Sequence, residues 1–321
     1  MLGTAAAVSG ALAAGQASGE QAVEEIKVGK RIRRVAKNGN IRHSIVAWCF
    51  QDYWSPDELI PIAKEMGCVS VELMEPKFYP DLKKHGLECA IAGIDIGGPP
   101  FMRGFNNPKY HDMVIAATKK SIDECKEFGW KKVIAFTGYD EGLSKAEGAA
   151  NCVKGFKEVV GYAEKAGVTI CLEHLNTRDD THPMKGHPGY AGDDVEYCID
   201  ILERVGSPNL KLLFDIYHVS IMNGDVIRRL HQHKDWLGHI HTAGNPGRAE
   251  LDDNQEINYP ACMNALVEIG YDGYVGHEFI PTRDPVAGLH QAIELCDVYS
   301  LTDYSSSRYF TIGEFDVKIK R

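Results

Sequence analysis

The stretch at residues 237–248, LGHIHTAGNPGR, begins with the alternation of a β-strand and ends in the Gly, Asn and Pro residues of a loop. Two histidines, His239 and His241, stand two positions apart in the strand-like part. Because side chains alternate between the two faces of a strand, both imidazoles point to the same side. Apolar packing does not require imidazoles there, so we ask whether other strands end in the same way.

Similar runs of apolar and β-branched residues recur along the chain. Segments with apolar residues at three- and four-residue spacing, which is typical of amphipathic helices, lie between most of them. The connection between the second and third runs is too short to predict a helix. The predicted strands are 43–50, 68–74, 87–94, 131–138, 168–176, 210–218, 237–244 and 273–281, and the predicted helices are 56–66, 110–128, 146–166, 193–205, 220–233, 259–269 and 285–299.

Eight strands that alternate with helices predict an α/β fold, the (β/α)₈ or TIM barrel. An open doubly wound sheet usually has fewer strands and a glycine-rich first turn. Neither GxGxxG nor GxxxxGK[ST] occurs in the sequence. We predict an N-terminal leader at residues 1–41, a barrel domain at 42–300 and a C-terminal extension at 301–321.

The composition limits the class of protein. A chain of 321 residues with 44% hydrophobic residues can bury a barrel-sized core. Its formal net charge of -10 argues against nucleic-acid binding, which needs a basic surface. The nine cysteines are scattered singly without a CxxC pair, and several fall in apolar strand-like runs. We therefore expect buried thiols rather than disulfides.

The first residues, MLGTAAAVSGALAAGQASG at 1–19, are small and apolar, like the hydrophobic part of an export signal, but no basic region precedes them. Two interpretations stay open. The segment is either a disordered leader of a cytoplasmic protein, or the end of a twin-arginine signal whose arginines precede Met1, which would make the protein periplasmic. No other run has ~18 uninterrupted apolar residues, so we expect no membrane span.

Four consecutive predicted strands each supply one polar residue near the carboxyl end: Glu173, Asp215, His241 and Glu278. In a barrel these ends meet at one mouth, where the chemistry lies. Three carboxylates in a confined site repel one another unless a counter-charge is present. Alone, each carboxylate fits an ordinary ion pair; together the four residues predict one bound divalent cation. Oxygen ligands with one imidazole favour Mn²⁺ or Mg²⁺, and Co²⁺ is also compatible.

Three other side chains are candidates around this site. His239 shares the face of His241 one layer deeper, so we expect it to lie behind the ligands or in the core rather than to bind the metal. Glu72 is either an inward carboxylate near the mouth or part of a structural ion pair. Trp48, at the end of the first strand, is either a pocket wall or a core residue.

The residues from about 42 to 299 resemble the xylose-isomerase-like TIM-barrel superfamily of sugar isomerases and epimerases, and within it most closely the hydroxypyruvate isomerases. One difference concerns position 241, where hydroxypyruvate isomerases often have Gln and the related ketose 3-epimerases have His. That difference bears on the substrate rather than on the metal site. The similar segments are GHIHTAGNPGRAE at 238–250, DDNQEINYP at 252–260, GYDGYVGHEFIP at 270–281 and FDIYH at 214–218.

The resemblance implies that Glu173 and Glu278 are both metal ligands and acid/base groups, and that His218 and Arg248 bind substrate oxygens. It implies an isomerase that acts on a small sugar or hydroxy-keto acid through an enediolate. The alternatives are a ketose 3-epimerase or a keto-sugar dehydratase or lyase on the same metal site. A metal-dependent phosphodiesterase and a non-catalytic sugar-binding protein are further alternatives. A homo-oligomer is compatible with the sequence.

Overall fold

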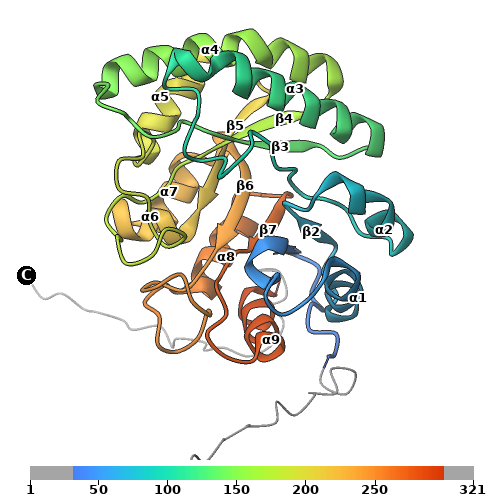
Figure 1. The fold of residues 1–321 in the computed structure, drawn as a ribbon. Helices are drawn as coiled ribbons and strands as arrows, with labels where there is room; N and C mark the ends of the chain where they lie inside the picture. The colour runs from blue at the N-terminus through green and yellow to red at the C-terminus, as the bar shows by residue number, and fades with distance from the viewer. Residues whose placement is uncertain (1–31, 300–321) are drawn as a thin grey trace, which may run out of the picture. The chain divides into compact units, whose positions relative to one another are not determined.

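The computed structural model describes residues 32–299, and within them a parallel sheet curves around a central core (Figure 1). Neighbouring strands follow the order β2-β1-β7-β6-β5-β4-β3, so the first and last parts of the described chain meet at the β1–β7 pair. The strands are β1 (Arg42–Val46), β2 (Ser70–Glu72), β3 (Lys132–Phe136), β4 (Thr169–Glu173), β5 (Leu210–Asp215), β6 (Leu237–Thr242) and β7 (Tyr274–His277).

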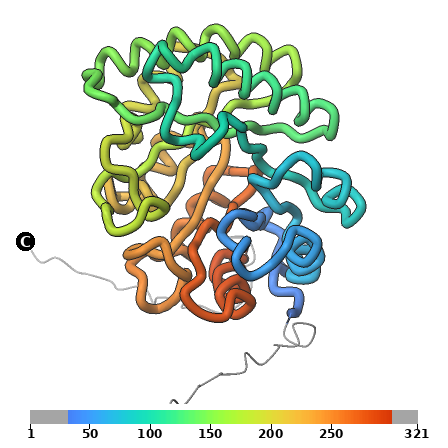
Figure 2. Tube along the Cα trace, in the orientation of Figure 1, coloured from blue at the N-terminus to red at the C-terminus, as the bar shows by residue number. Residues whose placement is uncertain are grey.

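The prediction of a strand at residues 87–94 is wrong in detail. This segment makes only two isolated bridges, one from Glu88 to Ser70 on β2 and one from Ala92 to Val133 on β3. The Ala90 N–H donates to the Ser70 hydroxyl at 2.8 Å instead of to a strand carbonyl, which interrupts the ladder. The segment still passes between β2 and β3 and closes the circle of the barrel (Figure 2). The (β/α)₈ architecture is therefore confirmed, with an irregular third position.

Helices cover the outside of the sheet (Figure 1). The α-helices are α1 (Pro56–Met66), α2 (Tyr79–Lys84), α3 (His111–Phe128), α4 (Lys145–Ala166), α5 (Val195–Val205), α6 (Ile216–Met222), α7 (Val226–Gln232), α8 (Tyr259–Glu268) and α9 (Pro285–Cys296), and the 3₁₀ turns are Ala47–Phe50, Pro76–Phe78, Pro108–Tyr110 and Lys234–Trp236.

Two helix predictions need correction. The single helix expected at 220–233 is two helices, α6 and α7, because the chain turns at Gly224 and Asp225, whose φ angles are 62° and 52°. A backbone with positive φ cannot continue a right-handed helix. The connection after β2, for which no helix is predicted, contains the short helix α2.

Local sequence signals explain where helices begin and end. At the start of α4, Ser144 and Glu147 form a capping box: the Glu147 carboxylate accepts from the Ser144 N–H at 3.1 Å, and the Ser144 hydroxyl accepts from the Glu147 N–H at 3.3 Å. The same helix ends at Gly167, whose φ of 65° lies in the left-handed region that glycine adopts without strain.

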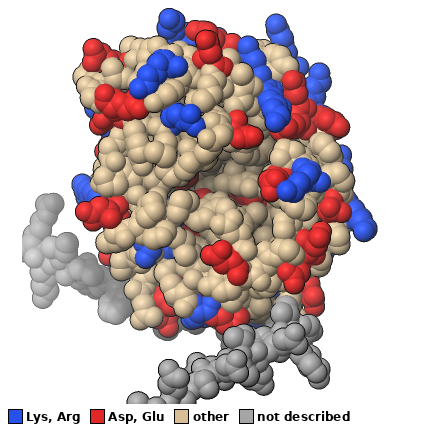
Figure 3. Space-filling model, in the orientation of Figure 1, with Lys and Arg blue, Asp and Glu red and all other residues tan. Residues whose placement is uncertain are grey.

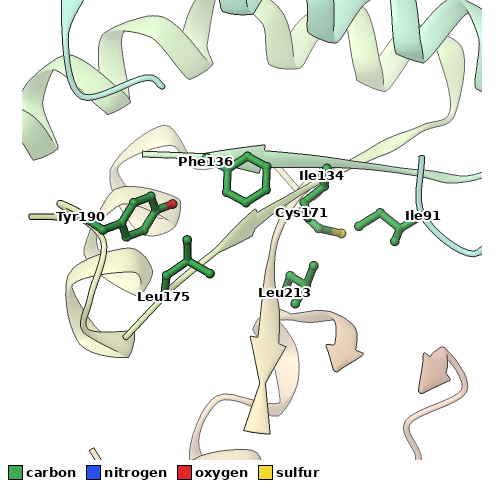
Figure 4. Close-up of a cluster of buried hydrophobic side chains, with 7 residues drawn as sticks. All are labelled: Ile91, Ile134, Phe136, Cys171, Leu175, Tyr190 and Leu213. Atoms are coloured by element: carbon green, nitrogen blue, oxygen red, sulfur yellow. The ribbon is translucent and has the colours of Figure 1, made fainter. Parts of the chain in front are cut away.

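The interior of the barrel has two unlike halves. One half is a cluster of buried hydrophobic side chains from β3, β4, β5, the segment before β3 and the loop after β4 (Figure 4). The other half, on β1, β2 and β6, contains buried polar side chains. The hydrophobic cluster consists of Ile91, Ile134, Phe136, Cys171, Leu175, Tyr190 and Leu213, and the polar half contains Ser44, Ser70, Glu72, His239 and His241. His43, Thr242 and His277 occupy the alternate positions of the same strands and face the helices, where His43 Nε2 lies 3.6 Å from Asp297 after α9.

The described part of the expected leader contacts the barrel. Val35 and Ile41 are buried, and the Lys37 and Asn38 N–H groups donate to the Asp297 carboxylate after α9. The domain boundaries at residues 41 and 300 stay predictions, and residues 1–31 and 300–321 lie outside the described residues. All nine cysteines are buried and free, as expected. None of the helices within residues 32–299 is long and apolar enough to cross a membrane.

Candidate active site and metal centre

The four polar residues at the strand ends lie together. Glu173 ends β4, Asp215 ends β5, His241 lies near the end of β6, and Glu278 follows β7 directly. The register places Asp215 beside His241, and the Glu278 N–H donates to the Thr242 carbonyl at 2.9 Å. One ligand-type atom of each of the four lies within 4.8 Å of the others, and all four side chains are buried.

His241 is central in this group. Its Nδ1 lies 2.8 Å from Glu278 Oε2 and 3.5 Å from Glu173 Oε1. Its Nε2 lies 2.7 Å from Glu72 Oε1 on the other side of the ring. A carboxylate can only accept, so the Glu72 contact assigns a proton to Nε2. Nδ1 faces the Glu278 and Glu173 carboxylates and must be without a proton to ligate a cation.

Glu72 lies beneath the site and is fully buried. Its Oε1 also accepts from His239 Nε2 at 2.8 Å, so one carboxylate oxygen holds both imidazoles of the strand. Glycine is required at position 276, because a Cβ there would lie 2.4 Å from Glu72 Oε1 and 2.9 Å from the His241 ring. Of the two sequence interpretations of Glu72, the buried ion pair describes its position; it does not face the mouth.

Glu278 is held from two sides. Its Oε1 accepts from Trp48 Nε1 at 2.9 Å, and its Oε2 accepts from Arg248 Nη2 at 2.5 Å. Arg248 Nη1 donates to the Met184 carbonyl at 2.7 Å, and its backbone has a φ of 52°, an uncommon value for a non-glycine residue. Arg248 Nε has no hydrogen-bond partner within residues 32–299. Trp48 and Arg248 thus fix the orientation of this carboxylate.

Asp215 and His218 form a second pair at the start of α6. Asp215 Oδ1 accepts from the Tyr217 N–H at 2.8 Å and caps the helix, which leaves Oδ2 toward the cluster. His218 Nδ1 accepts from the Asn176 N–H at 3.0 Å and from its side-chain amide at 2.7 Å. The proton of His218 therefore lies on Nε2, which is 3.5 Å from Asp215 Oδ2.

The charges of the two glutamates are set by different surroundings. Burial raises the pKa of Glu173, and its Oε1 has no hydrogen-bond partner in the described chain. Burial acts on Glu278 in the same direction, but the Arg248 guanidinium and the His241 imidazole outweigh it and hold the pKa of Glu278 low. Glu173 is therefore the carboxylate that accepts a proton near neutral pH, and Glu278 stays ionised.

The donor set fits a divalent cation. Within residues 32–299, Glu173 Oε1, Asp215 Oδ2 and His241 Nδ1 are buried without a hydrogen-bond partner, although all point into the same cluster. Burial lowers the pKa of His241, but the carboxylates of Glu278, Glu173 and Glu72 outweigh it and hold that pKa well above its usual range. A proton or a cation is thus strongly attracted to this point.

A cavity of about 600 Å³ opens over the cluster. Glu173, Glu278, Arg248 and Trp48 line it, so Trp48 is a pocket wall, which is one of its two predicted positions. Figure 3 shows the surface hollowed near the centre of this face, with mostly uncharged residues around the hollow.

The loop after β4 contributes side chains to the cavity that the sequence pattern does not predict. His182, Met184 and His187 line it, and burial lowers the pKa of His187 to about 4, so this ring is neutral. Asn176, which orients His218, belongs to the same loop. The available signal was the presence of two histidines in a loop that follows a predicted functional strand.

The protein is a TIM barrel with carboxylates and an imidazole at the carboxyl ends of its strands. Comparison with known proteins shows to which family of such barrels it belongs. Residues 60–298 match the family described as "Xylose isomerase-like TIM barrel". The chain belongs to this family, and the predicted resemblance is confirmed.

Curated relatives bear isomerase names. The chain is 38% identical over 144 residues to 2-oxo-tetronate isomerase of Cupriavidus necator, which is 44% of this chain and 52% of that protein. It is 29% identical over 182 residues to hydroxypyruvate isomerase of Escherichia coli, which is 56% of this chain and 66% of that protein. The aligned part thus spans about half to two thirds of these two relatives. Family membership and these relatives identify the chain as an enzyme.

Solved structures share the fold. A structure described as an AP endonuclease, family 2, from Brucella melitensis superposes with a TM-score of 0.67 at 23% identity. The superposition covers 78% of this chain and 97% of that chain. At this level of identity the likeness supports the barrel and carries no argument about the reaction.

Proposed function

We propose that the protein is a divalent-metal-dependent isomerase of a small hydroxy-carbonyl substrate, and that it acts through an enediolate. One observation carries the proposal: Glu173 is a buried carboxylate with a raised pKa and an unpaired oxygen, at the edge of a cavity and beside a group of metal-type ligands. The isomerase names of the relatives support the same class of reaction.

Glu173, Asp215, His241 and Glu278 would hold the cation, and their oxygen-rich composition favours Mn²⁺ or Mg²⁺. When bound, such an ion polarises a carbonyl and the adjacent hydroxyl, which acidifies the C–H between them. Glu72 does not need a second ion, because its short contacts to His239 and His241 are hydrogen bonds.

Glu173 is the proposed base. Its carboxylate takes the proton from the carbon that bears the hydroxyl, and the electron pair of the C–H bond forms the enediolate double bond while the carbonyl oxygen takes up negative charge. Return of the same proton to the neighbouring carbon, together with transfer of the hydroxyl proton to the former carbonyl oxygen, turns the original hydroxyl into the new carbonyl and completes the isomerisation. Glu278, which Trp48 and Arg248 keep ionised and fixed, serves mainly as a ligand.

His218 and Arg248 are the proposed partners of substrate oxygens. His218 Nε2–H has no hydrogen-bond partner within the described chain, and burial keeps the ring neutral by lowering its pKa. Arg248 Nε–H is unpaired among the same residues, and the guanidinium lines the cavity. Both therefore offer a buried donor that a substrate oxygen can satisfy.

A ketose 3-epimerase is the second candidate. His241 favours it, because the resemblance places His at this position in those enzymes. Epimerisation needs a carboxylate on each face of the substrate, whereas here the pKa of Glu173 is raised and that of Glu278 is lowered. A phosphodiesterase is disfavoured because Arg248 is the only arginine or lysine among the described residues that line the cavity.

The test is proton exchange in D₂O, followed by NMR over a panel of hydroxypyruvate, ketohexoses, inososes and keto-glycosides with Mn²⁺ added. We expect exchange at the hydroxyl-bearing carbon of at least one substrate, loss of exchange in EDTA, and one divalent ion per chain by elemental analysis. Full activity in EDTA with no bound metal would overturn the metal dependence. Binding of a sugar without exchange would instead favour a non-catalytic binding protein.

A further inference from the structure

The cavity extends well beyond the polar cluster, on the side of β3 and β4. Its volume of about 600 Å³ is in the middle of the ~300–1,000 Å³ range of sites that enclose drug-sized ligands. A three-carbon keto acid bound at Glu173 would leave most of this space to water. Apolar side chains bound the remaining space, and we call them the apolar wall. They are Pro99, Pro100, Phe101, Ile134, Phe136 and Leu175.

The apolar wall is built from contacts between separate parts of the chain. The Phe101 ring lies edge-on to Phe136 of β3, with centroids 6.4 Å apart. It also packs on the His187 ring at 4.3 Å, which joins it to the loop after β4. Phe136 and Leu175 belong to the hydrophobic cluster of the barrel interior (Figure 4), so the wall is continuous with the core.

The apolar wall contains no arginine or lysine side chain. Arg248, the single arginine or lysine among the described lining residues, donates to Glu278 and to the Met184 carbonyl. A substrate phosphate would therefore meet no free cation along the apolar wall. Hydroxyl groups of a long sugar chain would likewise lose their hydrogen bonds to water there without replacement.

We propose that the substrate is a hydroxy-carbonyl compound with an apolar substituent, such as an alkyl or aryl group, which packs on the apolar wall while the hydroxy-carbonyl end lies at Glu173. This inference rests on the proposed function and narrows its substrate class. Burying apolar surface in a pre-formed pocket is favourable, whereas an unfilled apolar cavity contributes nothing to transition-state binding.

The experiment compares hydroxyacetone, hydroxymethyl propyl ketone and hydroxymethyl phenyl ketone as substrates for deuterium exchange with Mn²⁺ present. These probes share the reactive group and differ only in the substituent. A buried methylene contributes about fourfold in binding, which corresponds to ~0.8 kcal/mol. We therefore expect kcat/KM for exchange to rise by about tenfold or more from the methyl to the propyl compound, and to be high for the phenyl compound.

Two neighbouring variants separate the apolar wall from a general effect. Phe101→Ala should reduce the phenyl-to-methyl ratio of kcat/KM by at least about fivefold, because it removes ring contacts from the wall. Met102→Ala is the matched control: Met102 is adjacent in sequence, 42% exposed and not part of the cavity lining, so the ratio should not change.

Each outcome decides between the two proposals. Equal kcat/KM for the three ketones, or preference for hydroxyacetone, would overturn the substrate class and leave the proposed function in place. If no ketone exchanges, the proposed function fails. Calorimetric binding of hydroxymethyl phenyl ketone then decides whether the apolar wall binds the substituent. Binding that Phe101→Ala weakens would support the apolar subsite. Absence of binding would overturn it. Binding that is lost as protein concentration rises would also overturn it, because a second copy of the chain would then cover the wall.

Discussion

The two halves of the barrel interior are built from the same parallel sheet but meet different needs. On the β3–β5 side, Ile134, Cys171 and Leu213 fill the interior with apolar surface. On the β6 side, His239 and His241 both contact one oxygen of the buried Glu72 carboxylate, at 2.8 Å and 2.7 Å. The apolar half stabilises the fold through burial, while the polar half costs desolvation and is retained only where its groups are paired or functional.

Hydrogen bonding of the buried polar groups differs between the bottom and the top of the polar half. At the bottom of the polar half, Glu72 Oε1 accepts from both His239 and His241, while Glu72 Oε2 and His239 Nδ1 have no hydrogen-bond partner among residues 32–299. At the top, unpaired atoms of Glu173, Asp215 and His241 lie in one cluster with ligand atoms within 4.8 Å of one another, and Glu173 lines the cavity; these statements hold for residues 32–299. Unsatisfied buried polar atoms are destabilising, so the meeting of three atoms of metal-ligand type in one cluster supports the proposed site for a cation and a substrate.

The largest expected effect is loss of the proposed base. Glu173→Gln should lower turnover by at least ~10²-fold and abolish deuterium exchange, because a general base typically contributes ~10²–10⁴-fold. Glu278→Gln should also lower turnover by at least ~10²-fold, but it should still wash deuterium into the substrate. Rates are measured at saturating Mn²⁺, with metal occupancy checked for both variants.

Equal and complete loss of exchange in both variants, with metal retained, would contradict a single base. It would show that the two carboxylates act as a unit, as an epimerase requires. Loss of exchange together with loss of metal would assign the effect to ligand removal, and exchange would then be compared at matched occupancy.

The second effect concerns stability in the apolar half. Leu213→Ala, at a fully buried position, should lower the free energy of unfolding by ~2–5 kcal/mol through lost burial and a residual cavity. Ile227→Ala, at a position that is 41% exposed, is the control and should change it by less than ~0.5 kcal/mol. Urea unfolding of the metal-free protein measures both, and equal losses would show that the interior cluster is not a core.

The third effect concerns the bottom of the polar half. Glu72→Gln keeps the shape of the side chain but weakens its hold on His239 and His241, so metal affinity should fall by ~10–100-fold. Glu75→Gln, an exposed carboxylate on the same side of the chain, is the matched control. Titration calorimetry with Mn²⁺ measures both, and a Glu72 variant that binds like the control would remove Glu72 from the site.

Hydrophobic periodicity predicted most of the barrel because strands and helices repeat their burial pattern over many residues. The segment 87–94 differed because a single side chain, Ser70, takes the Ala90 N–H, and no pattern in one sequence encodes that long-range competition. The split between α6 and α7 carried a local signal, Gly224, which a strong helical pattern concealed.

The position of the site residues at strand ends predicted which ones meet, since parallel strands end at one mouth. The partners of each atom were not predictable. That Glu72 pairs with both His239 and His241 depends on the space left at Gly276. The contribution of His187 depends on the path of an irregular loop, which periodicity does not describe.

The smallest expected effect is the change that Glu173→Gln makes in the pH dependence of metal binding. Burial raises the pKa of Glu173 and of Asp215, and the surrounding carboxylates hold the pKa of His241 high despite its burial. A group with a raised pKa keeps its proton to a higher pH, and each such proton must leave before its atom can ligate a cation. Mn²⁺ affinity of the metal-free protein should therefore fall as pH is lowered from ~8 to ~5, by at most about tenfold per pH unit for each proton released. Calorimetry in two buffers of different ionisation enthalpy counts these protons, and Glu173→Gln, which has none to release at that position, should show a shallower slope. An affinity that is constant over this range, with no protons released, would contradict the assignment of these carboxylates and this imidazole as the ligands.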